Sequence, residues 1–210
     1  LITFTLILIS GTSGWIIEQA SFSKVPILNI SGSIILIVLL ASTIAYRSLR
    51  QSVLAILNCL PEQPSNQDLE KARKKLSHIV GRDVNHLDKN EILRATAESA
   101  SENSVDGIFA PMFWMAIGII FWSLSTKLPG PLTLALCFKA SSTIDSMIGY
   151  KKGDLIWLGY AGAKLDDLLT WIPCRIVLLT LPFVSRRFYL IPKYIKEALV
   201  DGKNDESPNS

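Results

Sequence analysis

Charged and uncharged residues occupy separate long blocks of this chain. The three blocks without any charged residue are 1–17, 25–46 and 107–126. About 20 consecutive apolar residues are needed for a helix to cross a bilayer. Segments 25–46 and 107–126 are therefore predicted to be complete membrane spans, and residues 1–17 the end of an earlier span. The short hydrophilic turns at 18–24 and 127–130 would join antiparallel neighbours.

Two further apolar segments contain ionisable residues. Segment 131–150 includes Lys139 and Asp145, and segment 168–185 includes Arg175 and two prolines. Charged groups at membrane depth are costly and are retained mostly where they face protein or a water-filled cavity. Each segment is thus either a functional span or a re-entrant or interfacial helix. The whole pattern predicts an all-α, polytopic integral membrane protein.

The region between the second and third blocks is hydrophilic and has helical periodicity. Ser65 and Asp88 are each followed three residues later by an acid, which is the spacing of a helix N-cap. The second of these helices is expected to run to about Asn103. The first carries an apolar stripe formed by Leu69, Ala72, Leu76, Ile79 and Val80. We therefore predict one membrane domain, residues 1–210, with a helical insertion at 47–106.

Composition narrows the class of protein. The 210 residues carry 21 basic and 18 acidic side chains, for a formal net charge of +3, and the mean hydropathy is +0.34. This mixture of apolar blocks and normally charged segments excludes a plain soluble domain, a disordered chain and a fibrous repeat. The small, dispersed net charge argues against nucleic-acid binding. The three cysteines have no motif spacing, so neither a disulfide framework nor a zinc site is expected, and a reducing compartment fits better.

The distribution of basic residues leaves the membrane topology open. Nine Lys or Arg residues in the 47–106 insertion place it in the cytoplasm by the positive-inside rule. A loop predicted at 149–167 then falls on the same side. If segment 168–185 spans the membrane, however, the basic residues between 186 and 196 lie outside. A re-entrant or interfacial 168–185 would remove the conflict.

The first candidate site is an acidic stripe. Arg94, Glu98, Glu102 and Asp106 recur every four residues, so in a helix they share one face. Stacked carboxylates repel one another unless a cation joins them, and hard cations such as Mg²⁺ choose oxygen ligands. The alternative is a solvated acidic face with Arg94 as its counterion. The position favours a ligand, because the stripe leads directly into the span predicted from Ile108.

Two more candidate sites lie beside the interrupted apolar segments. Asp145 is followed by a glycine turn and Lys151. This order predicts either a carboxylate and an ammonium that face one pocket, or a capped helix end anchored at the membrane interface. Asp166 and Asp167 are adjacent carboxylates, a pattern that often binds a divalent ion. Arg175 carries a planar group suited to phosphate or carboxylate; the alternative is a loop acid pair with a snorkelling arginine. The sequence has no Walker loop, so any ATP site is of another kind.

Three stretches of the sequence are distinctive when taken together. They are GRDVNHLDKNEILRATAESASENSVDGIFAP (81–111), STIDSMIGYKKGD (142–154) and AKLDDLLTWIPCR (163–175). They resemble the CbiB/CobD family of cobalamin biosynthesis, the adenosylcobinamide-phosphate synthases, over roughly residues 65–210. The tail at 207–210 resembles the start of a family motif that normally continues, and the chain begins inside an apolar run. We therefore expect a fragment that lacks both ends.

The resemblance implies an integral enzyme of the bacterial cell membrane with its active site on the cytoplasmic side. Members of the family use ATP to join aminopropanol, or its O-phosphate, to the remaining propionate carboxylate of adenosylcobyric acid. The product is adenosylcobinamide or its phosphate. The implied cofactors are ATP and Mg²⁺. The implied partners are the corrinoid, the amino alcohol, the lipid bilayer and other enzymes of the corrinoid pathway.

ATP-dependent amide formation needs a metal, cationic groups for phosphates and a base for the incoming amine. The residues expected to supply them are Asp145, Asp166 and Asp167 for the metal; Arg82, Asn103 and Arg175 for the cofactor; and Glu98, Glu102, Asp106, Asp145 and Lys151 for catalysis. Glu98 or Glu102 is the expected base, and Lys151 is a further phosphate or carboxylate clamp.

Two other functions compete with the ligase. One is a non-catalytic membrane regulator, similar to the AmpE-like proteins linked to β-lactamase induction. Such a regulator has no evident need for the acidic motifs, so these motifs favour the ligase. The other is a small transporter with Lys139, Asp145 and Arg175 lining a path. The charged motifs flank the predicted spans and the sequence has no visible inverted repeat, which disfavours a transporter.

Overall fold

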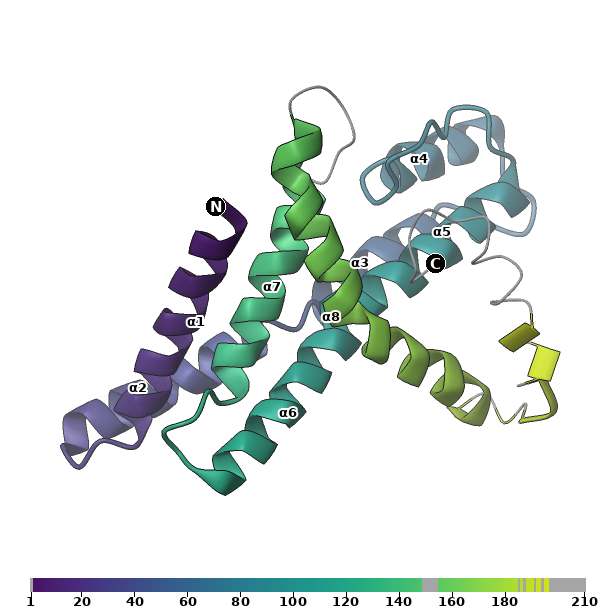
Figure 1. Cartoon of the computed structure of the whole chain (residues 1–210). Helices are drawn as coiled ribbons and strands as arrows, with labels where there is room; N and C mark the ends of the chain where they lie inside the picture. The colour runs from purple at the N-terminus through teal and green to yellow at the C-terminus, as the bar shows by residue number, and fades with distance from the viewer. Residues whose placement is uncertain are drawn as a thin grey trace. The chain divides into compact units, whose positions relative to one another are not determined.

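A computed structural model describes residues 2–148 and 155–184, and beyond them residues 186, 188–190, 192, 193, 195 and 196. Every regular element in these residues is helical, which confirms the predicted all-α fold class. Figure 1 shows the helices, which are α1 (Ile2–Ser21), α2 (Pro26–Ser42), α3 (Tyr46–Leu57), α4 (Asn66–Leu76), α5 (Lys89–Ser104), the π-helical turn η1 (Val105–Phe109), α6 (Ala110–Leu124), α7 (Pro131–Ile148), α8 (Leu155–Val184) and the 3₁₀ turn η2 (Phe188–Leu190).

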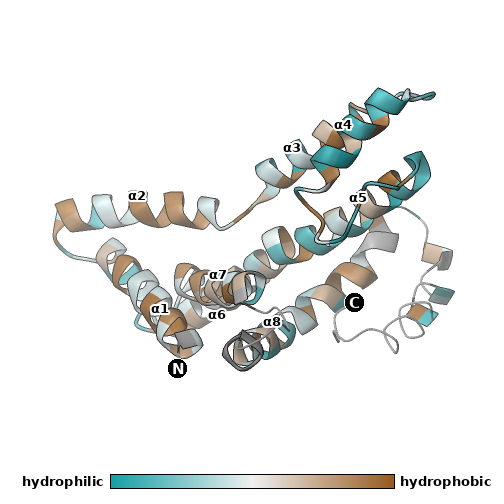
Figure 2. Cartoon of the chain, turned by 90° about the horizontal axis from the view of Figure 1, so that it is seen from above, coloured by the Kyte–Doolittle hydropathy of each residue, from teal (hydrophilic) through white to brown (hydrophobic). Residues whose placement is uncertain are grey.

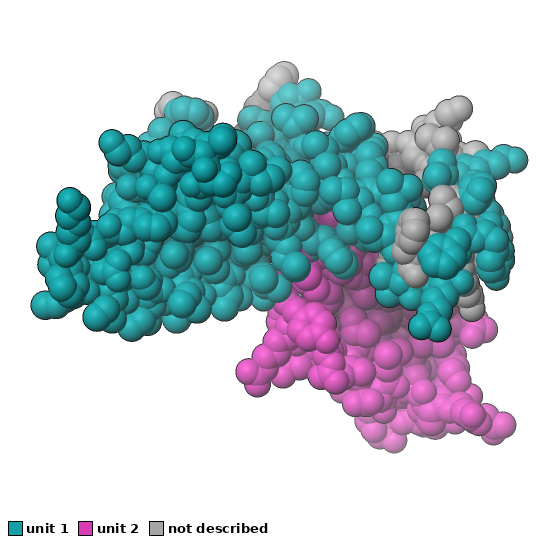
Figure 3. All heavy atoms as spheres, turned by 90° about the horizontal axis from the view of Figure 1, so that it is seen from below, with its two compact units in different colours: residues 1–44, 109–210 teal, residues 45–108 magenta. Residues whose placement is uncertain are grey.

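The chain divides into two compact units, which Figure 3 colours separately. Unit 1 comprises Leu1–Ile44 and Phe109–Ser210, and unit 2 comprises Ala45–Ile108. The segment predicted as a helical insertion, 47–106, falls inside unit 2. Unit 2 is therefore a separate helical body that interrupts the sequence of unit 1 between α2 and α6.

Unit 2 is built from α3, α4 and α5, each of which contacts the other two. Capping boxes begin α4, at Ser65 with Asp68, and α5, at Asp88 with Glu91. The boxes satisfy backbone N–H groups that have no partner inside the helix. The core consists of Ile56, Ala72, Leu76, Val84, Ile92 and Ala95. The predicted apolar stripe of α4 thus forms part of this core, and α3, which the sequence pattern does not single out, contributes Ile56.

The backbone that enters unit 2 is fixed to the backbone that leaves it. Pro111 has no N–H to donate to Gly107, four residues earlier, so this carbonyl lacks its usual helical partner. The backbone N–H of Ala45 donates to the Gly107 carbonyl instead, at 2.7 Å. The π-helical turn η1 lies directly before this proline and was not expected from the sequence.

In unit 1, α7 is the central helix and contacts α1, α2, α6 and α8. Two glycines let neighbouring helices approach the start of α7 closely. A Cβ atom on Gly14 of α1 would lie 2.9 Å from the Cα of Thr133, and one on Gly118 of α6 would clash with the backbone of Gly130. No side chain fits at either point, so both positions require glycine.

Two helical stretches, Pro26–Leu57 and Lys89–Leu124, are long and apolar enough to cross a membrane. Their charge-free parts correspond to the predicted spans 25–46 and 107–126. Only 11% and 22% of their apolar windows are buried, so most of these side chains face outward, and Figure 2 shows the hydrophobic colour along α2. That any of the five predicted segments crosses a membrane remains a prediction; these are 1–17, 25–46, 107–126, 131–150 and 168–185.

The region after α7 differs from the sequence prediction. A loop is predicted at 149–167, but α8 already begins at Leu155. The loop is therefore wrong from residue 155 onward, because the largely apolar run LIWLGYAGA extends the helix ahead of the acid pair. The helix then continues through Pro173 to Val184, and Figure 1 shows its ribbon bending on the way. A proline inside a helix is a usual cause of such a bend.

Candidate functional site

The predicted site residues fall into two groups, one in each unit. Unit 2 contains Arg82, Glu98, Glu102, Asn103 and Asp106, and unit 1 contains Asp145, Asp166, Asp167 and Arg175. Lys151 lies outside the described residues. Each group has its own geometry.

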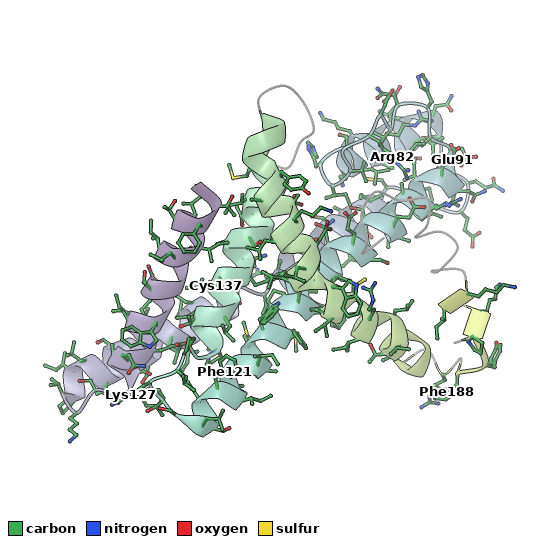
Figure 4. All side chains as sticks on the ribbon, in the orientation of Figure 1. Arg82, Glu91, Phe121, Lys127, Cys137 and Phe188 are labelled. Atoms are coloured by element: carbon green, nitrogen blue, oxygen red, sulfur yellow. The ribbon has the colours of Figure 1, made fainter. Side chains whose placement is uncertain are left out.

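In unit 2, Glu98 is held between two arginines. Arg94 Nε donates to Glu98 Oε1 at 2.8 Å, and Arg82 Nη2 donates to Glu98 Oε2 at 2.9 Å. These charge-assisted hydrogen bonds, that of Arg94 foremost, hold the pKa of Glu98 below its usual value. Arg82, labelled in Figure 4, comes from the turn that follows α4, so Glu98 ties α5 to a second segment of unit 2.

This arrangement suits Glu98 to orienting the two guanidinium groups. Both of its oxygens accept hydrogen bonds, and a carboxylate with a lowered pKa is a weaker proton acceptor. Glu102 is exposed one helical turn further along α5. Of the two predicted bases, the geometry therefore favours Glu102.

The acidic stripe of α5 changes register before Asp106. Asp106 lies in the π-helical turn η1, whose wider hydrogen-bond spacing rotates the following residues relative to an α-helix. Asn103 donates from Nδ2 to the carbonyl and the hydroxyl of Ser99, at 2.8 Å and 3.2 Å. The Ser99 hydroxyl donates in turn to the Ile79 carbonyl at 2.7 Å. The Asn103 amide thus supports Ser99, whose hydroxyl holds α5 to the turn after α4.

The acids of unit 1 gather where α8 packs against the end of α7. A Cβ atom on Gly162 would lie 2.8 Å from Ile144 Cγ2, so the two helices are close at this level. The carboxyl groups of Asp145 and Asp167 are near enough to repel each other electrostatically. Lys164 Nζ lies 3.8 Å from Asp167 Oδ2. Unit 1 therefore brings together two of the three residues predicted to bind a metal.

Asp166 belongs to the face of α8 that packs inward. Gly162, Asp166, Thr170 and Pro173 recur every three or four residues, and all but Asp166, which is half-buried, are buried. The Thr170 hydroxyl donates to the Asp166 backbone carbonyl at 2.6 Å. Within the described residues, no three His, Cys, Asp or Glu side chains are arranged to hold a metal ion.

Arg175 lies along its own helix. Its Nη1 donates to the Trp171 carbonyl at 2.9 Å, and its guanidinium carbon is 4.0 Å from the centre of the Trp171 ring. The cation–π contact and the hydrogen bond hold the guanidinium against its own helix. Binding a phosphate would therefore require the guanidinium to turn away from the ring.

A buried carboxylate, Glu18 of α1, is not singled out by the sequence pattern. It accepts hydrogen bonds from the backbone N–H groups of Gly130 and Thr133, both at 2.8 Å, and from the Thr133 hydroxyl at 2.6 Å. Glu18 is fully buried and caps the N-terminus of α7, where N–H groups lack partners inside the helix. The only signal in the sequence is an acid placed directly after an apolar run.

The family model described as CobD/Cbib protein matches residues 1–210, the whole chain. The chain belongs to the CobD/CbiB family. A cobalamin biosynthesis protein CobD from Synechocystis is 41% identical over 207 residues, which cover 98% of this chain and 56% of that protein. A CobD from Pelobacter propionicus is 38% identical, covering 86% of this chain and 51% of its own length. A probable CobD from Methanocaldococcus jannaschii is 36% identical, and the match covers 100% of this chain and 62% of that protein.

These CobD proteins are longer than the chain, which spans roughly half to three-fifths of their length. No solved structure matches the chain. The family predicted from the three motifs is confirmed. In this CobD/CbiB chain the first motif covers α5 with its Arg82–Glu98 pair, the second covers the end of α7 with Asp145, and the third covers the acid pair of α8.

Proposed function

We propose that the protein to which this chain belongs is a membrane enzyme of cobalamin biosynthesis. In the proposed reaction, aminopropanol or its O-phosphate is joined to adenosylcobyric acid through an ATP-dependent amide bond, which gives adenosylcobinamide or its phosphate. The observation that carries the proposal is the family match over all 210 residues. Relatives with 36–41% identity are named cobalamin biosynthesis proteins. The proposal concerns the whole protein, since the chain spans roughly half to three-fifths of the length of the relatives it matches.

Amide formation joins a carboxylate, which is a poor electrophile, to an amine that is protonated at neutral pH. ATP supplies the activation of the carboxylate, and Mg²⁺ offsets the charge of its phosphates. The chain has to bind these groups, offset their negative charge and accept the proton that the amine loses. In the proposal Glu102 accepts this proton, with Asp106 one turn away on the same segment.

The acids of unit 1 suit Mg²⁺ because this ion prefers oxygen ligands. It is usually held by one or two carboxylates together with waters and substrate phosphates. Asp145 and Asp167 supply such a pair, with Asp166 adjacent in the sequence. The described residues contain no closed group of three acids, which fits a metal that arrives with the nucleotide. The proposed phosphate and carboxylate clamps are Arg82, Lys151 and Arg175, the last with its guanidinium turned away from the Trp171 ring. Asn103 is proposed to bind the cofactor through its amide oxygen, since its Nδ2 donates to Ser99.

We further propose that unit 1 lies in the bacterial cell membrane with the Asp145 end of α7 toward the cytoplasm. α6 and α7 are joined by a short loop and pack together, so they run antiparallel. Glu18 caps α7 at the loop end, where it binds Thr133. Asp145 lies 12 residues after Thr133, which corresponds to about 18 Å along the axis of α7. The acids therefore lie at the opposite end from this loop. ATP is available in the cytoplasm, which supports the proposed orientation.

Lys127 in the α6–α7 loop offers a test of orientation. In a full-length protein without other cysteines, Lys127→Cys should react with an impermeant thiol reagent added to intact cells. A cysteine in place of Glu62, in unit 2, should react only after the cells are opened. The reverse result would contradict the orientation and leave the reaction untouched.

The reaction is tested with the full-length protein in membranes. It receives adenosylcobyric acid, MgATP and aminopropanol phosphate, and cobinamide phosphate is followed by mass. Absence of product from a folded preparation would contradict the ligase, and binding of the corrinoid without turnover would favour a regulator.

Asp166→Asn provides the residue-level test. We expect this variant to lose turnover while it still inserts into the membrane and unfolds at the wild-type temperature. Glu62→Gln, which removes one exposed negative charge from unit 2, is the control and should remain active. Normal turnover in Asp166→Asn would show that this aspartate does not hold the metal.

A further inference from the structure

Arg82 and Arg94 meet at one carboxylate on the surface of unit 2. Their side chains are 60% and 82% exposed, and that of Glu98 is 47% exposed. Each arginine uses one nitrogen in the pair, Nη2 of Arg82 and Nε of Arg94, while a guanidinium has five N–H donors. Neither guanidinium makes another hydrogen bond to the part of the chain that the structure describes. The group therefore has a formal charge of +1 and a large number of donors directed to solvent.

Three other basic side chains of unit 2 are used differently. Arg73, Lys75 and Lys89 donate to backbone carbonyls of another segment of the unit, at 2.6–3.0 Å. These bonds satisfy carbonyls and connect the helices, so they have a structural reason to exist. The partner of Arg82 and Arg94 is instead an exposed carboxylate, which water would solvate equally well. Arg82 connects its turn to α5 through this carboxylate, but Arg94 lies in the same helix as Glu98 and connects no second segment through it, so packing gives no reason for the second arginine.

We propose that Arg94 and Arg82 together form a fork that binds the phosphate group of a substrate, with Glu98 holding the two guanidinium groups side by side. Planar guanidinium groups bind phosphate oxygens through pairs of N–H donors, which a lysine does not reproduce. The sequence indicates Arg94 only as a counterion, whereas the structure assigns it to the same site as Arg82. This inference rests on the proposed function, whose phosphate-bearing substrates are ATP and, in one of its two forms, the amino alcohol O-phosphate.

Direct binding to the full-length protein in detergent micelles tests the fork. The probes are ATP and aminopropanol O-phosphate, each titrated separately by calorimetry. Arg94→Ala should weaken the binding of one of the two probes about tenfold, as expected for the loss of charge-assisted hydrogen bonds. Arg94→Lys should recover only part of this loss. Arg50→Ala removes an exposed arginine from α3 of the same unit and should leave both affinities within about twofold.

The probe whose affinity falls identifies the substrate that the fork binds. Unchanged binding of both probes in Arg94→Ala, or an equal loss in Arg50→Ala, would overturn the proposal, as would a folded wild-type protein that binds neither probe. Thermal unfolding of each variant shows that it is folded.

Binding and turnover also separate this inference from the ligase. Arg94-dependent binding in a protein that makes no amide product would support the fork and contradict the reaction. Product formation together with normal binding by Arg94→Ala would contradict the fork alone.

Discussion

The indole Nε1 of Trp114 donates a hydrogen bond to the backbone carbonyl of Leu169 at 3.1 Å. Leu169 lies four residues before Pro173, which has no N–H, so its carbonyl lacks the usual partner within α8. A side chain of α6 thus supplies the hydrogen bond that the proline removes. Asp166 and Asp167 lie within one turn of Leu169, so the contact fixes the part of α8 that carries the acid pair.

The interaction between Trp114 and Pro173 can be measured with a double-mutant cycle. Trp114→Phe leaves the Leu169 carbonyl without its partner and should lower the free energy of unfolding by about 1–2 kcal/mol beyond the loss of packing. Pro173→Ala restores an N–H four residues after Leu169. In the Pro173→Ala background, Trp114→Phe should therefore be less destabilising, with a coupling of about 1 kcal/mol in denaturant unfolding. Additive effects of the two substitutions would contradict this account.

Glu18→Gln should be strongly destabilising. The carboxylate accepts three hydrogen bonds at the start of α7, and an amide would turn its NH₂ group toward one of these donors. We expect a loss of about 3 kcal/mol in the free energy of unfolding, because the site is buried and the bonds are charge-assisted. Thr133→Val removes only the hydroxyl donor and should cost about 1 kcal/mol. Glu62→Gln, at an exposed site, is the control; equal stability of Glu18→Gln and this control would refute the cap.

Local signals account for the elements that the sequence predicts well. Ser65 and Asp88 cap α4 and α5 through groups only three residues away, and the charge-free blocks contain the helices α2 and α6. The remaining features depend on partners that are distant in the sequence. Glu18 finds its donors more than 100 residues later, and no local pattern indicates such a pair. Arg82 meets Glu98 because a turn brings the segments together, so the fork emerges only in three dimensions.

Ser141 is a position where we expect a substitution to stabilise the chain. It lies one turn before Asp145 on α7 and is fully buried, and its hydroxyl has no hydrogen-bond partner among the described residues. Burial of an unpaired hydroxyl is unfavourable, so Ser141→Ala should stabilise the chain by about 1 kcal/mol. Ser146→Ala is the matched control in the same helix, because Ser146 is exposed and its hydroxyl donates to the Ser142 carbonyl at 2.9 Å. Destabilisation by Ser141→Ala in thermal unfolding would show that the hydroxyl makes a stabilising hydrogen bond in the folded chain.

The titration of Glu98 tests the geometry of the two arginines directly. Arg94 and Arg82 lower the pKa of Glu98 in the folded chain from its ordinary value of 4.5. A carboxyl group with a lowered pKa stabilises the fold above its ordinary pKa, and this stability is lost as the pH falls through the folded value. The contribution should be no more than about 1 kcal/mol, because all three side chains are largely exposed and screened by solvent.

The two arginines should affect this pKa unequally. The Arg94 hydrogen bond is the largest cause of the shift, so Arg94→Ala should raise the pKa of Glu98 more than Arg82→Ala does. Arg50→Ala should leave it unchanged. The measurement is an acid titration of the Glu98 carboxyl carbon by NMR in a selectively labelled protein. A larger shift in Arg82→Ala would mean that Arg82 is the main partner, and equal small shifts in all three variants would mean that the pairs do not persist in solution. Because Glu98 holds both guanidinium groups, a persistent shift is also what a preorganised phosphate fork requires.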